Sequence, residues 1–254
     1  MALNGPQPRR RVLEDGDEFE TVLTWYPPGL SMAPHAHDCD QDSLLLAGSL
    51  QEETASRKIE VRAGAACFKA AGLGHANVYG REGALIMSLN RPHRPASGAP
   101  WRWRPTERRA AQELAAMAIS TRPEAADALS DFAELMDAGD RPAAPERSPH
   151  WLERVRAALD AEPGAARTET LAAEAGVHRV HLCRRFAAAY GVPFSLYRRQ
   201  VMVARALRDL LQGGETASVA ALNAGFADQA HFARALKAET GATPRRLSAL
   251  LSAG

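Results

Sequence analysis

The sequence predicts two domains of different fold class, an all-β jelly roll followed by an all-α domain with two helix-turn-helix units. Short apolar or alternating stretches separated by turn residues fill residues 19–90, which is typical of β-strands. From residue 106 onward the chain is rich in Ala, Leu and Glu, as helices are, and one helix-turn-helix pattern occurs twice. The 254 residues, 46% of them hydrophobic, suffice for more than one buried core.

The all-β domain is predicted over residues 1–100. Gly, Pro and Asp separate its strand-like stretches, and many short strands at close spacing favour a β-sandwich or barrel. Residues 91–100, which contain three prolines, end this pattern. The strand-like stretches are FETVLTWY, SLLLAGSL, KIEVRAG and GALIMSL.

A helical hairpin is predicted over residues 101–139. Helices are expected at 106–119 and 124–136, where apolar residues recur at helical spacing. The apolar face of this hairpin suits either packing on the β-domain or dimerisation, and the sequence does not separate the two. Residues 140–149 are Pro-rich and charged, which resists both helix and strand, so a linker is predicted there.

Charge divides the chain into two unlike parts. The net charge of the whole chain is +1, but the residues up to Ser148 carry −4 and those after it carry +5. Contacts of Lys and Arg with phosphates supply most non-specific affinity for nucleic acids. The C-terminal part therefore suits a polyanion, although a solvated basic surface would have the same charge.

Cysteine usage and hydropathy predict a soluble cytoplasmic protein. The three cysteines, Cys39, Cys67 and Cys183, are odd in number and widely spaced, so they form neither a disulfide framework nor a Cys-x-x-Cys pair. No apolar core follows the N-terminal charges, and no run approaches the ~18 apolar residues that a membrane span requires.

The repeated pattern begins at Thr168 and again at Thr216. Each threonine can cap a short helix of small residues. Gly176 and Gly225 follow, where the helix must stop and the turn needs positive φ. A second helix completes each copy. The two copies read TETLAAEAGVHRVHLCRRFAAAYG and TASVAALNAGFADQAHFARALKAETG.

The second helix of each copy has a predicted core face and a predicted outward face. Leu182 and Phe186 in the first copy, and Phe232 and Leu236 in the second, are four residues apart and should face the core. The remaining positions supply the candidate DNA contacts. These are Arg179, Val180, Cys183, Arg184, Gln229, Ala230, His231 and Arg234.

Arg184 and Arg234 occupy equivalent outward positions, 50 residues apart. An arginine on a helix in the major groove can make a bidentate contact with guanine, worth roughly 1 to 3 kcal/mol of discrimination. Two such helices on one chain can read successive faces of the major groove. Together with the basic charge, this pattern predicts binding to double-stranded DNA; the alternative is a helical bundle with incidental surface arginines.

The segment from about His150 to Leu251 resembles the C-terminal domain of the AraC/XylS family of transcription regulators. We therefore predict this domain over residues 150–254. The resemblance implies seven helices, with the segment at 196–211 bridging two recognition helices at 179–189 and 228–239, and it implies a homodimer. The residues that carry it are LAAEAG, LCRRF, GVPFSLY, GFADQAHFARALK and GATP.

The β-domain resembles a cupin jelly roll over about residues 15–95. Gln41 stands where the first cupin motif usually has Glu, Ala70 replaces Pro in the second, and Tyr79 replaces its terminal Asn. The two spacing patterns are Gly29-x5-His35-x-His37-x3-Gln41-x6-Gly48 and Gly64-x5-Ala70-x-Gly72-x2-His75.

Three histidines in these motifs suggest a metal site. His35 and His37 alternate by two on a strand and share a face, and His75 from a paired strand can complete the set. Three imidazoles with the carboxamide of Gln41 would suit one divalent transition metal ion, and Cys39 is a possible soft ligand. A metal-free pocket for an unknown small molecule is the preferred interpretation, because sensor domains of this regulator family commonly retain such histidines without binding metal.

The sequence thus predicts a sequence-specific DNA-binding transcription regulator, controlled by a small molecule or a metal ion in the cupin-like domain. The alternative function is a metal-dependent cupin enzyme fused to a DNA-binding domain. We expect no enzymatic activity, because no acid-base pair is evident. Asp38, Asp40 and Asp42 lie near the histidines, but we expect them to be solvated turn carboxylates.

Overall fold

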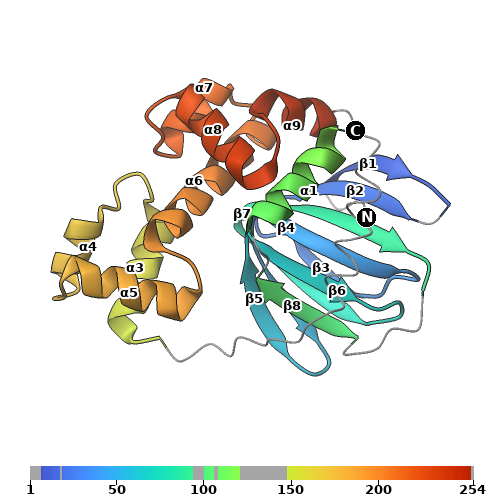
Figure 1. Ribbon diagram of the computed structural model, residues 1–254, viewed down its shortest axis with the longest axis horizontal. Helices are drawn as coiled ribbons and strands as arrows, with labels where there is room; N and C mark the ends of the chain where they lie inside the picture. The colour runs from blue at the N-terminus through green and yellow to red at the C-terminus, as the bar shows by residue number, and fades with distance from the viewer. Residues whose placement is uncertain (1–6, 18, 94–99, 106–107, 121–147, 253–254) are drawn as a thin grey trace, which may run out of the picture.

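A computed structural model describes residues 7–17, 19–93, 100–105, 108–120 and 148–252. Figure 1 shows a curved β-sheet beside an elongated group of helices. The predicted order of an all-β domain followed by an all-α domain is confirmed. None of the described helices combines the length and apolar character needed to cross a bilayer.

The sheet has eight strands and is antiparallel throughout, in the order β1-β2-β7-β4-β6-β8, with β3 paired to β7 and β5 paired to β4. The long strands β4 and β7 form its centre and bend, so that their ends pair with different neighbours. The strands are β1 (Arg9–Asp15), β2 (Glu20–Tyr26), β3 (Ser31–His35), β4 (Asp40–Thr54), β5 (Lys58–Arg62), β6 (Ala65–Lys69), β7 (His75–Arg91) and β8 (Trp101–Pro105).

The bend needs glycine where β4 passes β7. The β4–β7 register shifts between Leu45 and Ala47 and again between Gly48 and Leu50. Gly48 has φ +83°, and a Cβ there would overlap the carbonyl oxygen of Gly83. Only a residue without a Cβ allows this close approach.

Strand β8 corrects the predicted domain boundary. Residues 101–105 were assigned to the helical segment 101–139, but they pair with β6 and belong to the sheet. Trp101 is buried and Arg102 is half-buried, as expected for a strand with alternating faces. The sequence did not predict this strand, because the Pro-rich residues 91–100 interrupt the strand-like pattern and were interpreted as the end of the β-domain.

One helix follows the sheet, and seven helices form the C-terminal domain of the described chain, as the resemblance implied. The predicted helix at 124–136 and the linker residues 140–147 lie outside the described residues. The helices are α1 (Arg108–Ser120), α3 (His150–Ala161), α4 (Thr168–Glu174), α5 (Arg179–Tyr190), α6 (Phe194–Leu211), α7 (Ala217–Asn223), α8 (Gln229–Thr240) and α9 (Pro244–Leu251).

The two helix-turn-helix units, α4–α5 and α7–α8, have the predicted cores and turns. Leu182, Phe186, Phe232 and Leu236 are fully buried. Gly176 and Gly225 have φ of +67° and +93°, as the turns require.

Only one of the two predicted threonine caps is present. Thr216 caps α7 by accepting a hydrogen bond from the Val219 backbone N–H, at 3.3 Å. Thr168 does not cap α4, because the N-cap position is taken by Arg167, which makes no side-chain cap bond. The first helix of the first unit therefore starts one residue earlier than the cap pattern implied.

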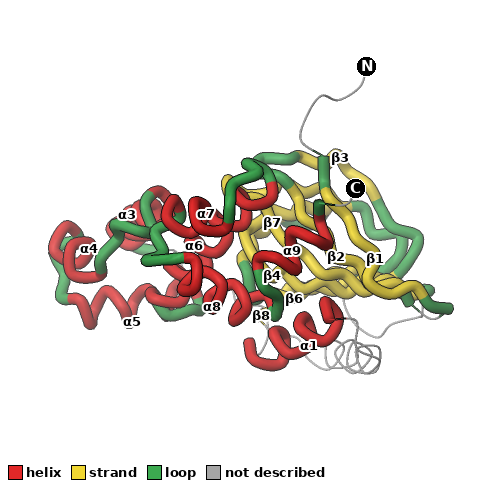
Figure 2. The backbone as a smooth tube through the Cα atoms, turned by 90° about the horizontal axis from the view of Figure 1, so that it is seen from above, coloured by secondary structure: helices red, strands yellow, loops and turns green. Residues whose placement is uncertain are grey.

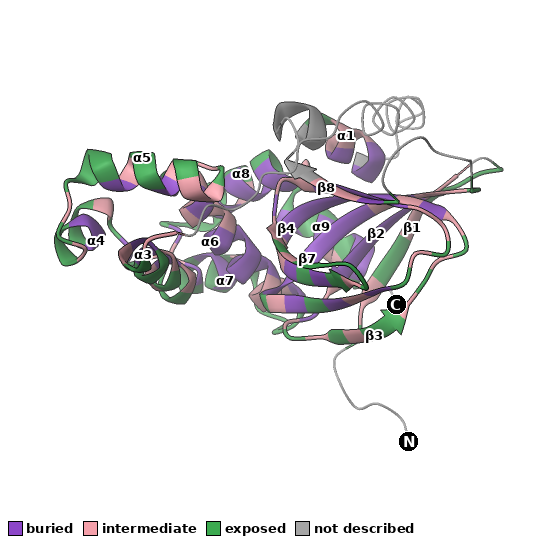
Figure 3. Ribbon diagram, turned by 90° about the horizontal axis from the view of Figure 1, so that it is seen from below, coloured by how far each residue is buried: buried purple, intermediate pink, exposed green. Residues whose placement is uncertain are grey.

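The two units have different cores. The first unit packs with α3 and the start of α6 in a core of its own, which includes Leu152 and Phe194. The second unit shares one continuous core with α1, α9 and the sheet, which joins Leu44 and Met87 to Phe232. Figure 3 shows the buried residues running from the sheet into the helices around α6 and α9.

Polar contacts complete the junction between the sheet and α6. Glu82 of β7 pairs with Arg205 and Arg208 of α6, and the contact with Arg205 measures 3.4 Å. Gln200 donates a hydrogen bond to the carbonyl oxygen of Ala63 at 3.1 Å. The bridging helix is therefore held against the sheet along much of its length.

The crossing of β4 and β7 gives a first prediction. We expect Gly72→Ala to lower the free energy of unfolding by roughly 1 to 2 kcal/mol, since Gly72 has positive φ but no neighbouring atom within 4 Å of a Cβ. Gly48→Ala should lower the free energy of unfolding by roughly 1 to 3 kcal/mol more than Gly72→Ala does, because a Cβ at Gly48 also overlaps the carbonyl of Gly83. Urea denaturation of both variants measures the difference, and equal losses would contradict the close approach.

Candidate effector site and nucleic-acid surface

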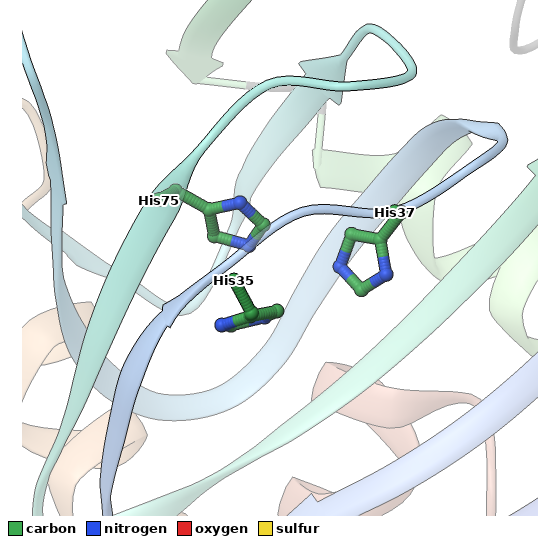
Figure 4. Close-up of side chains that lie close together, drawn as sticks. All are labelled: His35, His37 and His75. Atoms are coloured by element: carbon green, nitrogen blue, oxygen red, sulfur yellow. The ribbon is translucent and has the colours of Figure 1, made fainter.

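Three histidines meet inside the sheet, as the cupin spacing predicted. His35 ends β3 and is the register partner of His75, which begins β7, and His37 follows two residues after His35. One ring nitrogen from each lies within 4.8 Å of the others. Figure 4 shows the three rings turned toward a common volume.

Backbone carbonyls fix the tautomer of two of the rings, so that Nε2 is free to bind a cation. His35 Nδ1 lies 2.9 Å from the Ala33 oxygen, and His75 Nδ1 lies 3.1 Å from the Leu73 oxygen. Because a carbonyl only accepts, each Nδ1 carries the proton and each Nε2 offers its lone pair. His75 Nε2 is buried and has no hydrogen-bond partner among the described residues, so the ligand set fits a metal ion.

The local electrostatics keep two of these imidazoles neutral. Burial, and then the charge of Lys69, lower the pKa of His75 to about 4. Burial and Lys69 also lower the pKa of His37. Neutral imidazole is the form that ligates metals, so these rings need not lose a proton to bind one at neutral pH.

Gln41 and Cys39 differ in their relation to this site. Gln41 lines the same small cavity and donates its amide hydrogen to Asn90 Oδ1 at 3.0 Å, which leaves its carbonyl oxygen as the candidate ligand atom. Cys39 is not part of the histidine cluster. Burial, and then Asp38, raise the pKa of its thiol, which disfavours the thiolate that binds metals.

Sequence reasoning missed a buried carboxylate in this cavity. Glu52 of β4 has no exposed surface and pairs with Lys69 at 2.9 Å. Trp101 Nε1 donates to Glu52 Oε2 at 2.7 Å, and Trp103 Nε1 donates to the same oxygen. Burial alone would raise the pKa of Glu52, but Lys69 and these hydrogen bonds hold it below the usual value.

The register shifts in β4 explain why Glu52 was missed. Gln41 and Ser43 line the cavity, and a strict alternation from them would place Gln51 inward. The shifts between residues 45 and 50 change the phase, so Leu50 and Glu52 line it instead. Such a shift leaves no clear signal in the sequence around it.

Two other carboxylates correct the sequence interpretation. Asp40 and Asp42 were expected to be solvated, but both are buried. Asp40 accepts a hydrogen bond from the Ala71 backbone N–H at 2.8 Å, and Asp42 pairs with Arg91 at 2.5 Å. They lie at the start of β4, where pairing with β6 and β7 encloses them. Asp38 is exposed, as expected.

Two cavities of very different size are relevant to effector binding. The histidine cavity measures about 50 Å³, room for an ion and one or two waters. A second cavity of about 350 Å³ lies between the sheet and the helices α3 and α6, lined by Leu50, Val78 and Val201 among others. Tyr79 and Leu50 line both cavities, so they form part of the wall between them.

The predicted recognition helices are α5 and α8. Figure 2 shows both on the same side of α6. Seven of the eight candidate DNA contacts are exposed, and Cys183 is half-buried against the core of the first unit. The exposed ones are Arg179, Val180, Arg184, Gln229, Ala230, His231 and Arg234.

Side chains cap the N-terminal ends of α5 and α8. His178 Nδ1 accepts a hydrogen bond from the Val180 backbone N–H at 3.3 Å, and Asp228 accepts one from His231 at 2.6 Å. Arg199 of α6 pairs with the buried Glu239 of α8 at 2.9 Å. The two cap bonds fix the first turns of α5 and α8, and the ion pair joins the last turn of α8 to α6.

Comparisons with known proteins found one family model and several solved structures similar to parts of this chain. Residues 171–249 match the family model described as a helix-turn-helix domain. ToxT from Vibrio cholerae O395 is 12% identical over 98% of both chains, with a TM-score of 0.43. The C-terminal domain of AraT, a response regulator from Geobacillus stearothermophilus, is 21% identical over 40% of this chain and 85% of its own, with a TM-score of 0.38.

The β-domain also has a structural neighbour. KdgF from Halomonas sp. is 22% identical over 36% of this chain and 85% of its own, with a TM-score of 0.33. No curated protein matches the chain by sequence. The matched family model and the two repeated units show a helix-turn-helix domain at the C-terminal end of the described chain, beside an antiparallel sheet that holds the histidine cluster.

Proposed function

We propose that this regulator changes its DNA affinity in response to a divalent transition metal ion held by His35, His37 and His75, with Gln41 as a further ligand. The observation that carries this proposal is the buried, unpartnered Nε2 of His75 beside two other ring nitrogens. When bound, the ion would supply a concentrated positive charge inside the sheet. Imidazole ligands suit Zn, Cu, Fe and Ni.

The size of the histidine cavity favours a metal ion over an organic effector at this place. Organic ligand pockets usually span roughly 300 to 1,000 Å³, whereas this cavity measures about 50 Å³. The cavity of about 350 Å³ beside α6 would admit an organic effector. If this protein binds no metal, the cavity beside α6 becomes the candidate site for an organic effector.

The same size argument favours a sensor over a cupin enzyme. Glu52 and Lys69 are ionisable groups near the histidines, but they pair with each other and are both buried. A catalytic metal site needs an open position and room for substrate. The histidine cavity offers little space beyond an ion and its water.

On the DNA side, we propose that α5 and α8 enter successive turns of the major groove. Arg184 and Arg234 would contact guanine, and Val180, which is 48% exposed, would contact a thymine methyl group. Dimerisation through residues 106–136 and a cytoplasmic location remain predictions from the sequence. Most of that segment lies outside the described residues.

The first test concerns Arg184 and Arg234. A specific site is selected from random duplexes with the wild-type protein, and dissociation constants are measured by fluorescence anisotropy on that site and on a scrambled duplex. Replacing either arginine with Ala should weaken specific binding by about 10-fold or more, in line with roughly 1 to 3 kcal/mol for a bidentate base contact, and scarcely change non-specific binding.

Arg245→Ala is the matched control for this test, since Arg245 is also exposed but lies on α9, outside the recognition helices. It should leave the ratio of specific to non-specific affinity unchanged. Equal losses on both duplexes for Arg184→Ala and Arg234→Ala would assign those side chains to phosphates and refute base reading by them.

The second test concerns the metal. Elemental analysis of purified protein after reconstitution with Zn²⁺ or Ni²⁺ should give about one equivalent per chain. His35→Ala and His75→Ala should each reduce this content by at least tenfold. His93 is exposed, pairs with Asp40 and lies outside the histidine cluster, so His93→Ala is the control and should retain the metal content of the wild type. If the wild-type protein still contains no metal after reconstitution, the metal proposal is refuted. The proposal of DNA binding does not depend on that result.

A further inference from the structure

We propose that Glu52 connects the histidine site to the DNA-binding domain, because its carboxylate both faces the histidines and holds strand β8. A divalent cation on the histidines would change the hydrogen bonds that Glu52 accepts from Trp101 and Trp103. Helix α1, which follows β8, would pass this change to α8 and α9. The inference rests on the metal site proposed above.

The two oxygens of Glu52 face different neighbours. Oε1 lies 4.0 Å from His75 Nε2 and accepts a hydrogen bond from Lys69 at 2.9 Å. Oε2 accepts the indole hydrogens of Trp101 and Trp103. One carboxylate therefore lies 4.0 Å from the candidate ligand atom of His75 on one side and accepts hydrogen bonds from the last strand of the sheet on the other.

Charge makes Glu52 responsive to the contents of the site. It is a buried carboxylate that forms an ion pair with the buried Lys69. Buried charges interact strongly because little water screens them. With a divalent ion on the histidines, Glu52 would be attracted by two cationic groups instead of one, and Lys69 would be repelled.

Glu52 also supplies what the first cupin motif lacks in this chain. Gln41 stands in the position where that motif usually has Glu, so the three imidazoles have no charged partner at that ligand position. Glu52 reaches the same cavity from a position eleven residues further along β4. A carboxylate at this distance would act next to the ligands and compensate the charge of the ion.

Strand β8 passes the effect to the helices through chain connection and contact. Trp101 and Trp103 lie on β8, and α1 begins at Arg108. Ala116 of α1 sits against Gly241, at the C-terminal end of α8, where a Cβ would have no room. Arg246 of α9 donates hydrogen bonds to the Ile119 carbonyl at 3.3 and 3.0 Å.

Nuclear magnetic resonance of the indole N–H groups tests this proposal on the whole, unmodified chain. The protein has four tryptophans, so labelling with ¹⁵N-tryptophan gives four indole signals, assigned by single Trp→Phe variants. Titration with Zn²⁺ to one equivalent should shift the signals of Trp101 and Trp103. Trp25 and Trp151 make no hydrogen bond to Glu52 and serve as internal controls, with unchanged signals.

Glu52→Gln tests the role of the charge, because Gln keeps the shape and an acceptor oxygen. It should still bind Zn²⁺ but show less than about a fifth of the wild-type indole shifts. Wild-type affinity for the selected duplex should change at least about fivefold with Zn²⁺, a usual size for coupling between sites. In Glu52→Gln the change in duplex affinity caused by Zn²⁺ should fall below about twofold. Glu53 is the exposed neighbouring residue, and Glu53→Gln should show the same Zn²⁺-dependent change as the wild type.

The outcomes separate the two proposals. Zn²⁺ bound at one equivalent with all four indole signals unchanged would overturn the role of Glu52 and leave the metal site standing. Wild-type shifts confined to Trp101 and Trp103 support it even if Glu52→Gln does not fold. Absence of Zn²⁺ binding to the wild-type chain would overturn both.

Discussion

The structure depends on one continuous apolar core that joins the sheet to the second helix-turn-helix unit. Leu44 and Met87 of the sheet, Met202 of α6 and Phe232 of α8 belong to the same buried cluster. Burying a large apolar side chain contributes roughly 1.5 to 3 kcal/mol. Ion pairs at the domain junction that remain partly exposed contribute much less. The second unit and the sheet are thus stabilised by the same apolar core.

The first unit is attached differently, and this asymmetry bears on regulation. Its core is separate, and α3, which packs in that core, meets the sheet through polar contacts such as the Arg62–Asp160 pair at 3.1 Å. A few hydrogen bonds hold an orientation less firmly than a shared core, because each contributes about 1 kcal/mol net. The proposed reading of two turns of DNA would require both units in register along α6. A change in the sheet would therefore act on the second unit directly and on the first through α6 and the polar contacts of α3.

The features that the sequence predicted correctly are those set by local periodicity. The buried residues of α5 and α8 follow from the helical repeat, and the turns at Gly176 and Gly225 follow from the conformational freedom of glycine. The histidine cluster was predictable because two spaced motifs define it. Strand β8 and the burial of Asp40 depend on pairing with distant strands, which one sequence alone does not reveal.

Glu52 illustrates the limit most clearly, since its position depends on a change of phase inside one strand. The same irregularity makes the site possible. If β4 continued without register shifts, the exposed Gln51 would occupy the inward position and the carboxylate would face solvent. Lys69 would then be buried with no partner, which costs far more than an exposed lysine. The bend at Gly48, required for packing β4 against β7, therefore also determines which charges surround the three histidines.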